Sequence, residues 1–227
     1  MAHADFWSPI LISLKITAVA SVLVFLLALF AAYLLANRDF RGKALLETVL
    51  MLPLVLPPTV VGFGLLMLLG RHSWLGHFIE WLFGQPVIFT WWAGVIAVTV
   101  VAFPLVFQTL KTGFESVDEE IKDMARSFGA SEWQVFRHVT LSLSWRFLLS
   151  GYTFGFARGI GEFGATLMFA GNIPTRTQTV PTAIYLAAES GDMRLALYWV
   201  ISLVVLSFAL LSFVHRLRGF TAKDKAR

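Results

Sequence analysis

The sequence predicts an all-α integral membrane protein with five transmembrane helices, and its composition and the spacing of its apolar residues are the observations behind this class. Of the 227 residues, 57% are apolar and only 14% are charged. A water-soluble domain usually has about 45–50% apolar and about 25% charged residues. The apolar residues also gather in runs long enough to cross a bilayer, so we expect residues 1–227 to form one transmembrane domain and not a soluble enzyme.

Five apolar runs have the length that a membrane helix needs. Crossing about 30 Å of hydrocarbon takes roughly 20 helical residues. The expected spans cover residues 10–35, 45–69, 88–110, 147–170 and 195–214. The first run is longer than the apolar core of a cleaved signal peptide, which has about 7–15 residues, so we expect it to remain attached as a span.

The distribution of basic residues predicts how these spans are oriented. Lys and Arg residues gather after the first, third and fifth runs, and the last group consists of Arg216, Arg218, Lys223, Lys225 and Arg227. Because basic residues favour the cytoplasmic side, we expect the N-terminus outside and the C-terminus in the cytoplasm, which five crossings satisfy. This distribution explains the net charge of +4 without a nucleic-acid partner.

The second span is expected to bend. Pro53, Pro57 and Pro58 lack backbone donors, and neighbouring helices must satisfy the carbonyls that they free. The bend could serve movement or improve packing, and the sequence leaves both interpretations open. After this span, residues 74–83 predict an aromatic amphipathic helix at the outer surface of the lipid bilayer.

Between the third and fourth spans, residues 112–144 predict a cytoplasmic loop of two short helices. Ser116 and Glu119 form a capping box at the first start, and Gly129 is expected to end that helix in a left-handed conformation. A second start follows at Ser131, with Gln134 three residues later. The first helix carries an apolar stripe that could pack on the protein's own spans or on another chain, and the two interpretations are equally open. The stripe consists of Val117, Ile121, Met124, Ala125 and Phe128.

This loop resembles a pattern of ABC importer permeases, Glu-Ala-Ala, three residues, Gly, nine residues and Ile/Val-x-Leu-Pro. The corresponding residues are Asp123-Met124-Ala125, Gly129 and Val139-Thr140-Leu141, with Asp in place of Glu, Met in place of the first Ala, and Ser142 in place of Pro. In that family the helix docks into a cleft of a separate ATP-hydrolysing subunit. The resemblance therefore implies ATPase-coupling roles for Asp123, Met124, Ala125, Phe128, Gly129, Val139 and Leu141.

The fourth span carries glycines and charges in a regular pattern. Gly151, Gly155 and Gly159 recur every four residues, which allows another helix to approach closely. Arg158 and Glu162, also four apart, are placed to form an ion pair inside the membrane. The pair could line a pathway or fix one helix against its neighbours, and the sequence does not choose between these roles.

Two segments resemble the molybdate ABC transporter permease family. The first is Ala157-Arg158-Gly159-Ile160-Gly161-Glu162-Phe163-Gly164-Ala165-Thr166 with Asn172-Ile173-Pro174, and the second is Leu52-Pro53-Leu54-Val55-Leu56-Pro57-Pro58. The resemblance implies a type I ABC importer permease fold and a multi-pass location in the bacterial cytoplasmic (inner) membrane. It also implies a homodimer with two ABC ATPase subunits and an extracytoplasmic molybdate-binding protein. The residues assigned to the pathway or to helix packing are Pro53, Pro57, Pro58, Gly155, Arg158, Gly159, Glu162, Gly164 and Thr166.

The sequence contains no pattern typical of catalysis or of a cofactor site. It lacks a Gly-x-x-x-x-Gly-Lys-Ser/Thr run, so ATP and Mg are expected in the partner ATPase and no cofactor in this chain. There is no Cys, and the five His residues do not show metal-ligand spacing, so no metal site is expected. Permeases for tungstate or for sulfate and thiosulfate are close alternatives. An ion-coupled secondary transporter needs a deep carboxylate and usually repeats; Glu162 is the one deep carboxylate, and no repeat is evident.

Overall fold

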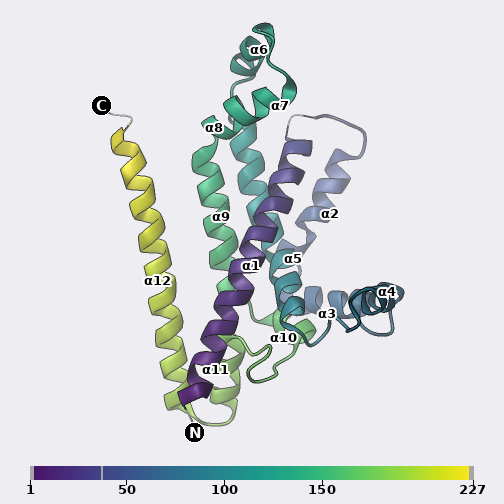
Figure 1. Ribbon diagram of the computed structural model, residues 1–227, viewed down its shortest axis with the longest axis vertical. Coiled ribbons are helices and arrows are strands. Elements are labelled where there is room, and N and C mark those ends of the chain that lie inside the picture. The colour runs from purple at the N-terminus through teal and green to yellow at the C-terminus, as the bar shows by residue number, and fades with distance from the viewer. Residues whose placement is uncertain (1–2, 37, 225–227) are drawn as a thin grey trace.

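The computed structural model describes residues 3–36 and 38–224, which form a bundle of long helices with shorter helices at both ends (Figure 1). At its centre, α1 (His3–Leu35) packs along α5 (Trp91–Glu115), and α9 (Trp145–Ile160) packs against both. Small residues make this packing close. Ala20, Ala28 and Ala32 of α1 are completely buried, and a Cβ on Gly155 of α9 would lie 3.0 Å from Val106 Cγ2 of α5.

The second apolar run forms two helices, α2 (Lys43–Val55) and α3 (Pro58–Leu69). The chain bends by 114° between them. The expected bend in the span over residues 45–69 is confirmed, and its size was not predicted. Leu56 is extended because the residue before a proline avoids the helical conformation, and Pro57 and Pro58 follow directly. Pro53 lies inside α2 and does not end it.

The expectation of one continuous helix over residues 147–170 was wrong. The fourth run forms α9 and a separate short helix, α10 (Gly164–Ala170), with residues 161–163 between them. Gly161 ends α9, and the Glu162 carboxylate accepts a hydrogen bond from the Ala165 N–H, which starts α10. In the described part of the chain, three helices have the length and hydropathy of a span, or four if α2 and α3 form one broken span.

The remaining helices lie at the two ends of the bundle. Helix α11 (Val180–Glu189) packs against α12 (Met193–Asp224). Helix α12 runs along the bundle from the end where α1 begins toward the opposite end (Figure 1). Lys225 and Arg227 of the basic tail lie outside the described residues. Helix α4 (Trp74–Phe83) extends sideways from the bundle at the end of α3, as Figure 1 shows, and Trp74 and Trp81 are exposed on it.

The loop between α5 and α9 forms the opposite end from the N-terminus (Figure 1). It contains α6 (Glu119–Ser127), α7 (Glu132–Gln134), a π-helix η1 (Val135–Thr140) and α8 (Leu141–Leu143). Helix α5 continues to Glu115, so the loop begins several residues later than the expected boundary at 112.

Candidate functional site

Side-chain caps define the two short helices of the loop. Asp118, and not Ser116, caps α6 through a 3.0 Å bond from the Glu120 N–H, while the Ser116 hydroxyl donates to the Gly113 carbonyl. Gly129 follows α6 with φ +89°, the left-handed conformation expected from the sequence. The second predicted start is confirmed, because Ser131 and Gln134 form a reciprocal capping box at α7.

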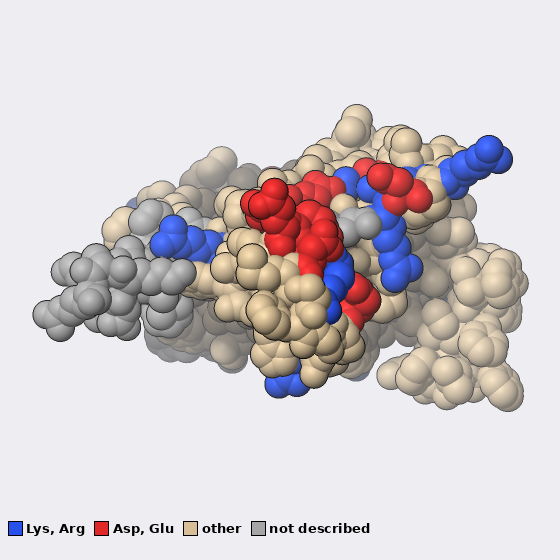
Figure 2. Space-filling view, turned by 90° about the horizontal axis from the view of Figure 1, so that it is seen from above, with Lys and Arg blue, Asp and Glu red and all other residues tan. Residues whose placement is uncertain are grey.

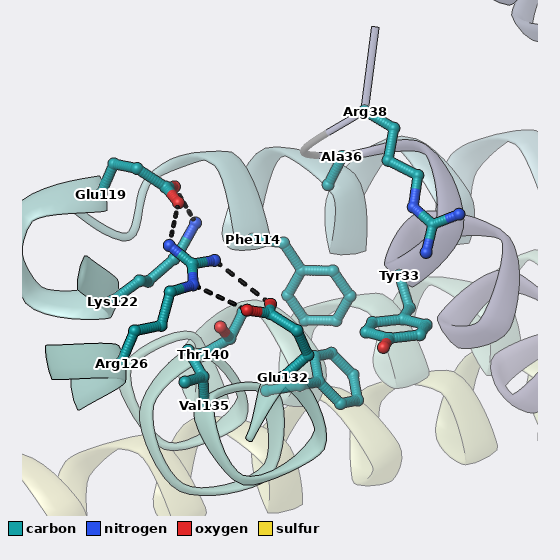
Figure 3. A pocket seen from close by; sticks show the side chains of 11 residues that line it. Tyr33, Ala36, Arg38, Phe114, Glu119, Lys122, Arg126, Glu132, Val135 and Thr140 are labelled. Carbon is teal, nitrogen blue, oxygen red and sulfur yellow. Dashed lines mark hydrogen bonds and ion pairs between the residues drawn. The ribbon is translucent and has the colours of Figure 1, made fainter. Parts of the chain in front are cut away.

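Arg126 holds α6 and α7 together through three carboxylates. Its guanidinium lies 2.9 Å from Glu119 Oε1 and 2.6 Å from Asp123 Oδ1, both on α6, and 2.8 Å from Glu132 Oε1 on α7. Figure 3 shows Arg126 between Glu119 and Glu132, and Figure 2 shows the acidic side chains gathered around basic ones at this end. The hydrogen bond from Arg126 lowers the pKa of Glu119, with Lys122 adding to the effect, and it also lowers the pKa of Glu132.

Aromatic packing attaches the loop to the long helices. Phe136 of η1 is buried, and its ring centroid lies 4.3 Å from that of Tyr33 on α1 and 5.5 Å from that of Phe114 on α5. Glu119, Lys122, Arg126 and Glu132 line a cavity of about 160 Å³ together with Tyr33 and Phe114 (Figure 3). The π-helix η1, which directly follows α7, is therefore in direct contact with α1 and α5.

The outer side of the loop is apolar and exposed. Met124 is 61% exposed and Phe128 is 85% exposed, and Ile121 and Trp133 are exposed beside them. Of the predicted stripe, only Val117 is buried, so the stripe does not pack back on the protein's own spans. Large apolar side chains at the end of a bundle, beside charged residues, are typical of a protein–protein contact.

The two helix breaks lie against each other. A Cβ on Gly164, the first residue of α10, would lie 3.2 Å from Pro58 Cβ and 3.1 Å from Thr59 Cγ2, both in the first turn of α3. Further along, a Cβ on Gly62 of α3 would lie only 2.7 Å from Ala165 Cα of α10. The short helices α3 and α10 therefore pack with their backbones nearly in contact, and both turn away from the direction of the long helices (Figure 1).

The predicted ion pair is present at the same junction. Arg158 Nη1, in the last turn of α9, lies 2.8 Å from Glu162 Oε2 in the break. The contact is a close ion pair without the alignment of a hydrogen bond, whereas Glu162 Oε1 accepts a 2.9 Å hydrogen bond from the Ala165 N–H. Glu162 thus joins the end of α9 to the start of α10.

The other residues singled out from the sequence lie inside the bundle or at the loop. Gly159 packs close to Val98 of α5 and Thr17 of α1, so the Gly155 and Gly159 face of α9 contacts its own protomer. The Thr166 hydroxyl is buried and has no hydrogen-bond partner in the described residues. Val139 lies in η1 and Leu141 in α8, and Val139 lines a hollow together with Ala125, Phe128 and Gly129. No group of three His, Asp or Glu in the described residues is placed to hold a metal ion.

Comparison with known proteins places the chain in a family. Residues 9–218 match the family described as binding-protein-dependent transport system inner membrane component. The chain belongs to this family. It is accordingly a permease subunit of a transporter, and not an enzyme.

Relatives within the family carry transport names. The chain is 52% identical over 216 residues to the putative molybdenum transport system permease protein YvgM of Bacillus subtilis (strain 168), and the match covers 95% of each chain. It is 41% identical over 196 residues to the molybdenum transport system permease protein ModB of Escherichia coli (strain K12), covering 84% of this chain and 86% of that protein. A probable sulfate transport system permease protein of Mesostigma viride is 31% identical, covering 91% of this chain and 79% of that protein.

Solved structures show the same fold. A bacterial ABC transporter involved in the import of the acidic polysaccharide alginate matches with a TM-score of 0.77 at 13% identity, over 96% of this chain and 79% of that one. The MetNI methionine ABC transporter matches with a TM-score of 0.74 at 16% identity, over 96% and 97%. The fold is therefore that of an ABC importer membrane subunit, as the resemblance implied.

The sequence analysis did not identify several residues that build these sites. No role was predicted for Arg126, Lys122 or Phe136, although together they fix the loop. The three carboxylates of Glu119, Asp123 and Glu132, spaced within seven residues of Arg126, could have predicted its ion pairs. Gly62 gave no signal, because its contact with Ala165 joins residues far apart in the sequence.

Proposed function

We propose that this chain is the membrane-spanning subunit of an ATP-driven importer that moves molybdate across the bacterial cytoplasmic membrane. The substrate assignment is supported by the relatives that are 52% and 41% identical, both of which have molybdenum transport names. The relative with a sulfate transport name is 31% identical. Delivery by an extracytoplasmic binding protein follows from the family, whose members depend on one.

The observation that carries the ATP-driven mechanism is the exposed stripe of the loop. Ile121, Met124 and Phe128 are outside the long apolar helices and are not covered by the protein itself. A separate ATPase subunit that covers them would supply the binding site for ATP and Mg. Asp123, Ala125, Gly129, Val139 and Leu141 would shape the same contact, and two such loops in a homodimer would engage two ATPase subunits.

In the proposed arrangement the chain crosses the membrane five times. Helices α1, α5 and α12 each cross once, α2 with α3 forms a broken crossing, and α9 with α10 forms another. The loop with α6 and α7 lies in the cytoplasm with the C-terminus, since basic residues concentrate there. The N-terminus then lies outside, at the end opposite to this loop (Figure 1).

The translocation pathway is proposed to pass the junction of α3 and α10, between two copies of the chain. Broken helices with irregular backbone are tolerated at membrane depth where protein or a water-filled cavity surrounds them. Pro57, Pro58 and Gly164 make the two breaks, so relative motion of the half-helices needs no rupture of a continuous helix. Closure of the ATPase subunits would move α6 and α7, and Phe136 would pass this movement to α1 and α5.

Uptake by the reconstituted complex tests the proposal. The chain is purified with its ATPase subunit, placed in liposomes, and supplied with labelled molybdate, the binding protein and ATP, with excess tungstate or sulfate as competitors. We expect uptake that requires ATP and resists sulfate. Loss of uptake to sulfate would assign a sulfate or thiosulfate permease, and stronger competition by tungstate would assign tungstate. Uptake without ATP would contradict the importer mechanism and favour an ion-coupled transporter.

A further inference from the structure

The two charges of the Arg158–Glu162 pair differ in their exposure to solvent. The Glu162 side chain is 1% exposed, whereas the Arg158 side chain is 34% exposed. The carboxylate therefore lies behind the guanidinium as seen from the open face of α9. An approaching anion meets the positive end of this pair first, although the pair has no net charge.

Glu162 also neutralises Arg158 only in part. One carboxylate oxygen faces Arg158 Nη1, and the other accepts the Ala165 N–H at the N-terminal end of α10, where the helix dipole is positive. The single negative charge is thus shared between the guanidinium and the helix. In the described residues, this is the one ion pair of Arg158, so most of the five guanidinium donors are left for another partner.

The position of Arg158 along α9 makes lipid an unfavourable partner. Arg158 lies 13 residues after Trp145, which places it about 20 Å along α9 at about 1.5 Å per residue. The hydrocarbon layer is about 30 Å thick, and a charged side chain that faces lipid inside it costs several kcal/mol. A partly exposed guanidinium at this depth must face water, a solute or another protein.

Two other basic side chains of the long helices, on α1 and α5, are placed differently. Lys15 lies 3.8 Å from the ring centroid of Trp91, the first residue of α5, near the outer end of that helix. Lys111 lies near the other end of α5 and contacts Glu47 at 2.8 Å and Glu115 at 3.5 Å. Of these three side chains, Arg158 is the one that is partly exposed beside the two helix breaks.

We propose that Arg158 faces the water-filled translocation pathway and attracts the oxyanion substrate there, so that it is a determinant of anion selectivity. Glu162 is its positioning residue, because it holds the guanidinium at the end of α9 and keeps its own charge out of the pathway. This inference rests on the proposed function for the identity of the substrate. The water-exposed position of Arg158 does not depend on that identity.

Cysteine labelling tests the position without any substrate. The chain contains no Cys, so an Arg158→Cys change combined with Glu162→Gln introduces a single thiol and strands no carboxylate. The glutamine amide keeps an oxygen that can accept the Ala165 N–H. In the liposome-embedded complex during ATP turnover, we expect the thiol of this double variant to react with membrane-impermeant methanethiosulfonates.

Two further single-thiol variants calibrate the labelling. Leu26→Cys, at an exposed apolar position inside α1, is expected not to react, and Arg176→Cys, in an exposed loop, reports full labelling. An unreactive thiol in the Arg158→Cys variant, beside a reactive one in the Arg176→Cys variant, would overturn the proposal.

Restoring a positive charge at position 158 tests whether Arg158 attracts the substrate. Arg158→Gln with Glu162→Gln is expected to retain ATPase assembly and to lose molybdate uptake by at least about tenfold, the factor that roughly 1.4 kcal/mol of attraction provides. Attaching an aminoethyl group to the thiol of the Arg158→Cys, Glu162→Gln variant restores the positive charge and should restore uptake, whereas a sulfonatoethyl group of similar size should not. The Glu162→Gln single variant reports what loss of the carboxylate does alone.

The outcomes separate the two proposals. Equal uptake with the cationic and anionic labels would overturn the selectivity role of Arg158. A wild-type complex that imports no molybdate, tungstate or sulfate would overturn the proposed function, while labelling of the Arg158→Cys variant would still report whether this position faces water.

Discussion

Two glycines of α3, Gly62 and Gly64, allow the close packing of α3 against α10 to be tested. A Cβ on Gly62 would lie 2.7 Å from Ala165 Cα, 2.8 Å from Ala165 O and 2.9 Å from Met168 Cβ. Two of these atoms belong to the backbone of α10 and cannot rotate away. Ordinary contacts begin near 3.4 Å, so Gly62→Ala requires α3 and α10 to separate by about 0.7 Å.

Gly64, two residues further along α3, provides the matched control. A Cβ there would have nothing within 4 Å. Both substitutions gain the same helix propensity, about 0.5–1 kcal/mol for Ala over Gly, so their difference isolates the clash. Overpacking of this kind costs about 1–3 kcal/mol. We therefore expect Gly62→Ala to be less stable than Gly64→Ala by about that amount.

The assay is thermal unfolding of the purified complex followed by tryptophan fluorescence, together with uptake in liposomes. Gly64→Ala is expected to unfold at or above the wild-type temperature and to transport normally. Gly62→Ala is expected to unfold at a lower temperature and to transport more slowly, because the half-helices can no longer close against each other. Equal unfolding temperatures for the two variants would refute the close packing of α3 on α10.

Three further predictions concern the loop that is proposed to contact the ATPase. Phe136→Ala removes a buried ring at a cost of about 3–5 kcal/mol, and we expect faster proteolysis of the loop while the spans stay intact. Gly129→Val places a branched residue at φ +89°, which costs at least about 1–2 kcal/mol, and less ATPase subunit should co-purify; unchanged co-purification would contradict the coupling role. The pKa values of Glu119 and Glu132 are lowered in the folded loop, so their stabilisation is complete above the ordinary value of about 4.3 and is lost as the pH falls through the folded values. Proteolysis of the loop should therefore rise below about pH 4, and Arg126→Gln should weaken that pH dependence, since Lys122 still contacts Glu119.

Much of the architecture was accessible from local patterns. Apolar length identified the regions of α1, α5 and α12, and glycine and capping residues placed the left-handed Gly129 and the start of α7. The prolines predicted a bend near Pro57 but not an angle of 114°, because the angle depends on what α3 packs against. The break after α9 was missed since Gly161 and Phe163 lie in an apolar run whose length alone fits a span.

For the charged residues too, the sequence predicted local contacts, whereas burial was decided by the tertiary structure. The spacing of Arg158 and Glu162 predicted their ion pair. Because the two residues are only about one helical turn apart, that spacing does not predict which of the two charges is buried. Burial depends on contacts with helices far along the chain, as does the exposure of Met124 and Phe128. Helix length, capping and charge bias are local properties and can be derived from neighbouring residues. The meeting of α3 with α10 and the orientation of the Arg158–Glu162 pair arise only when distant segments pack, because each is a contact between surfaces that the sequence does not place side by side.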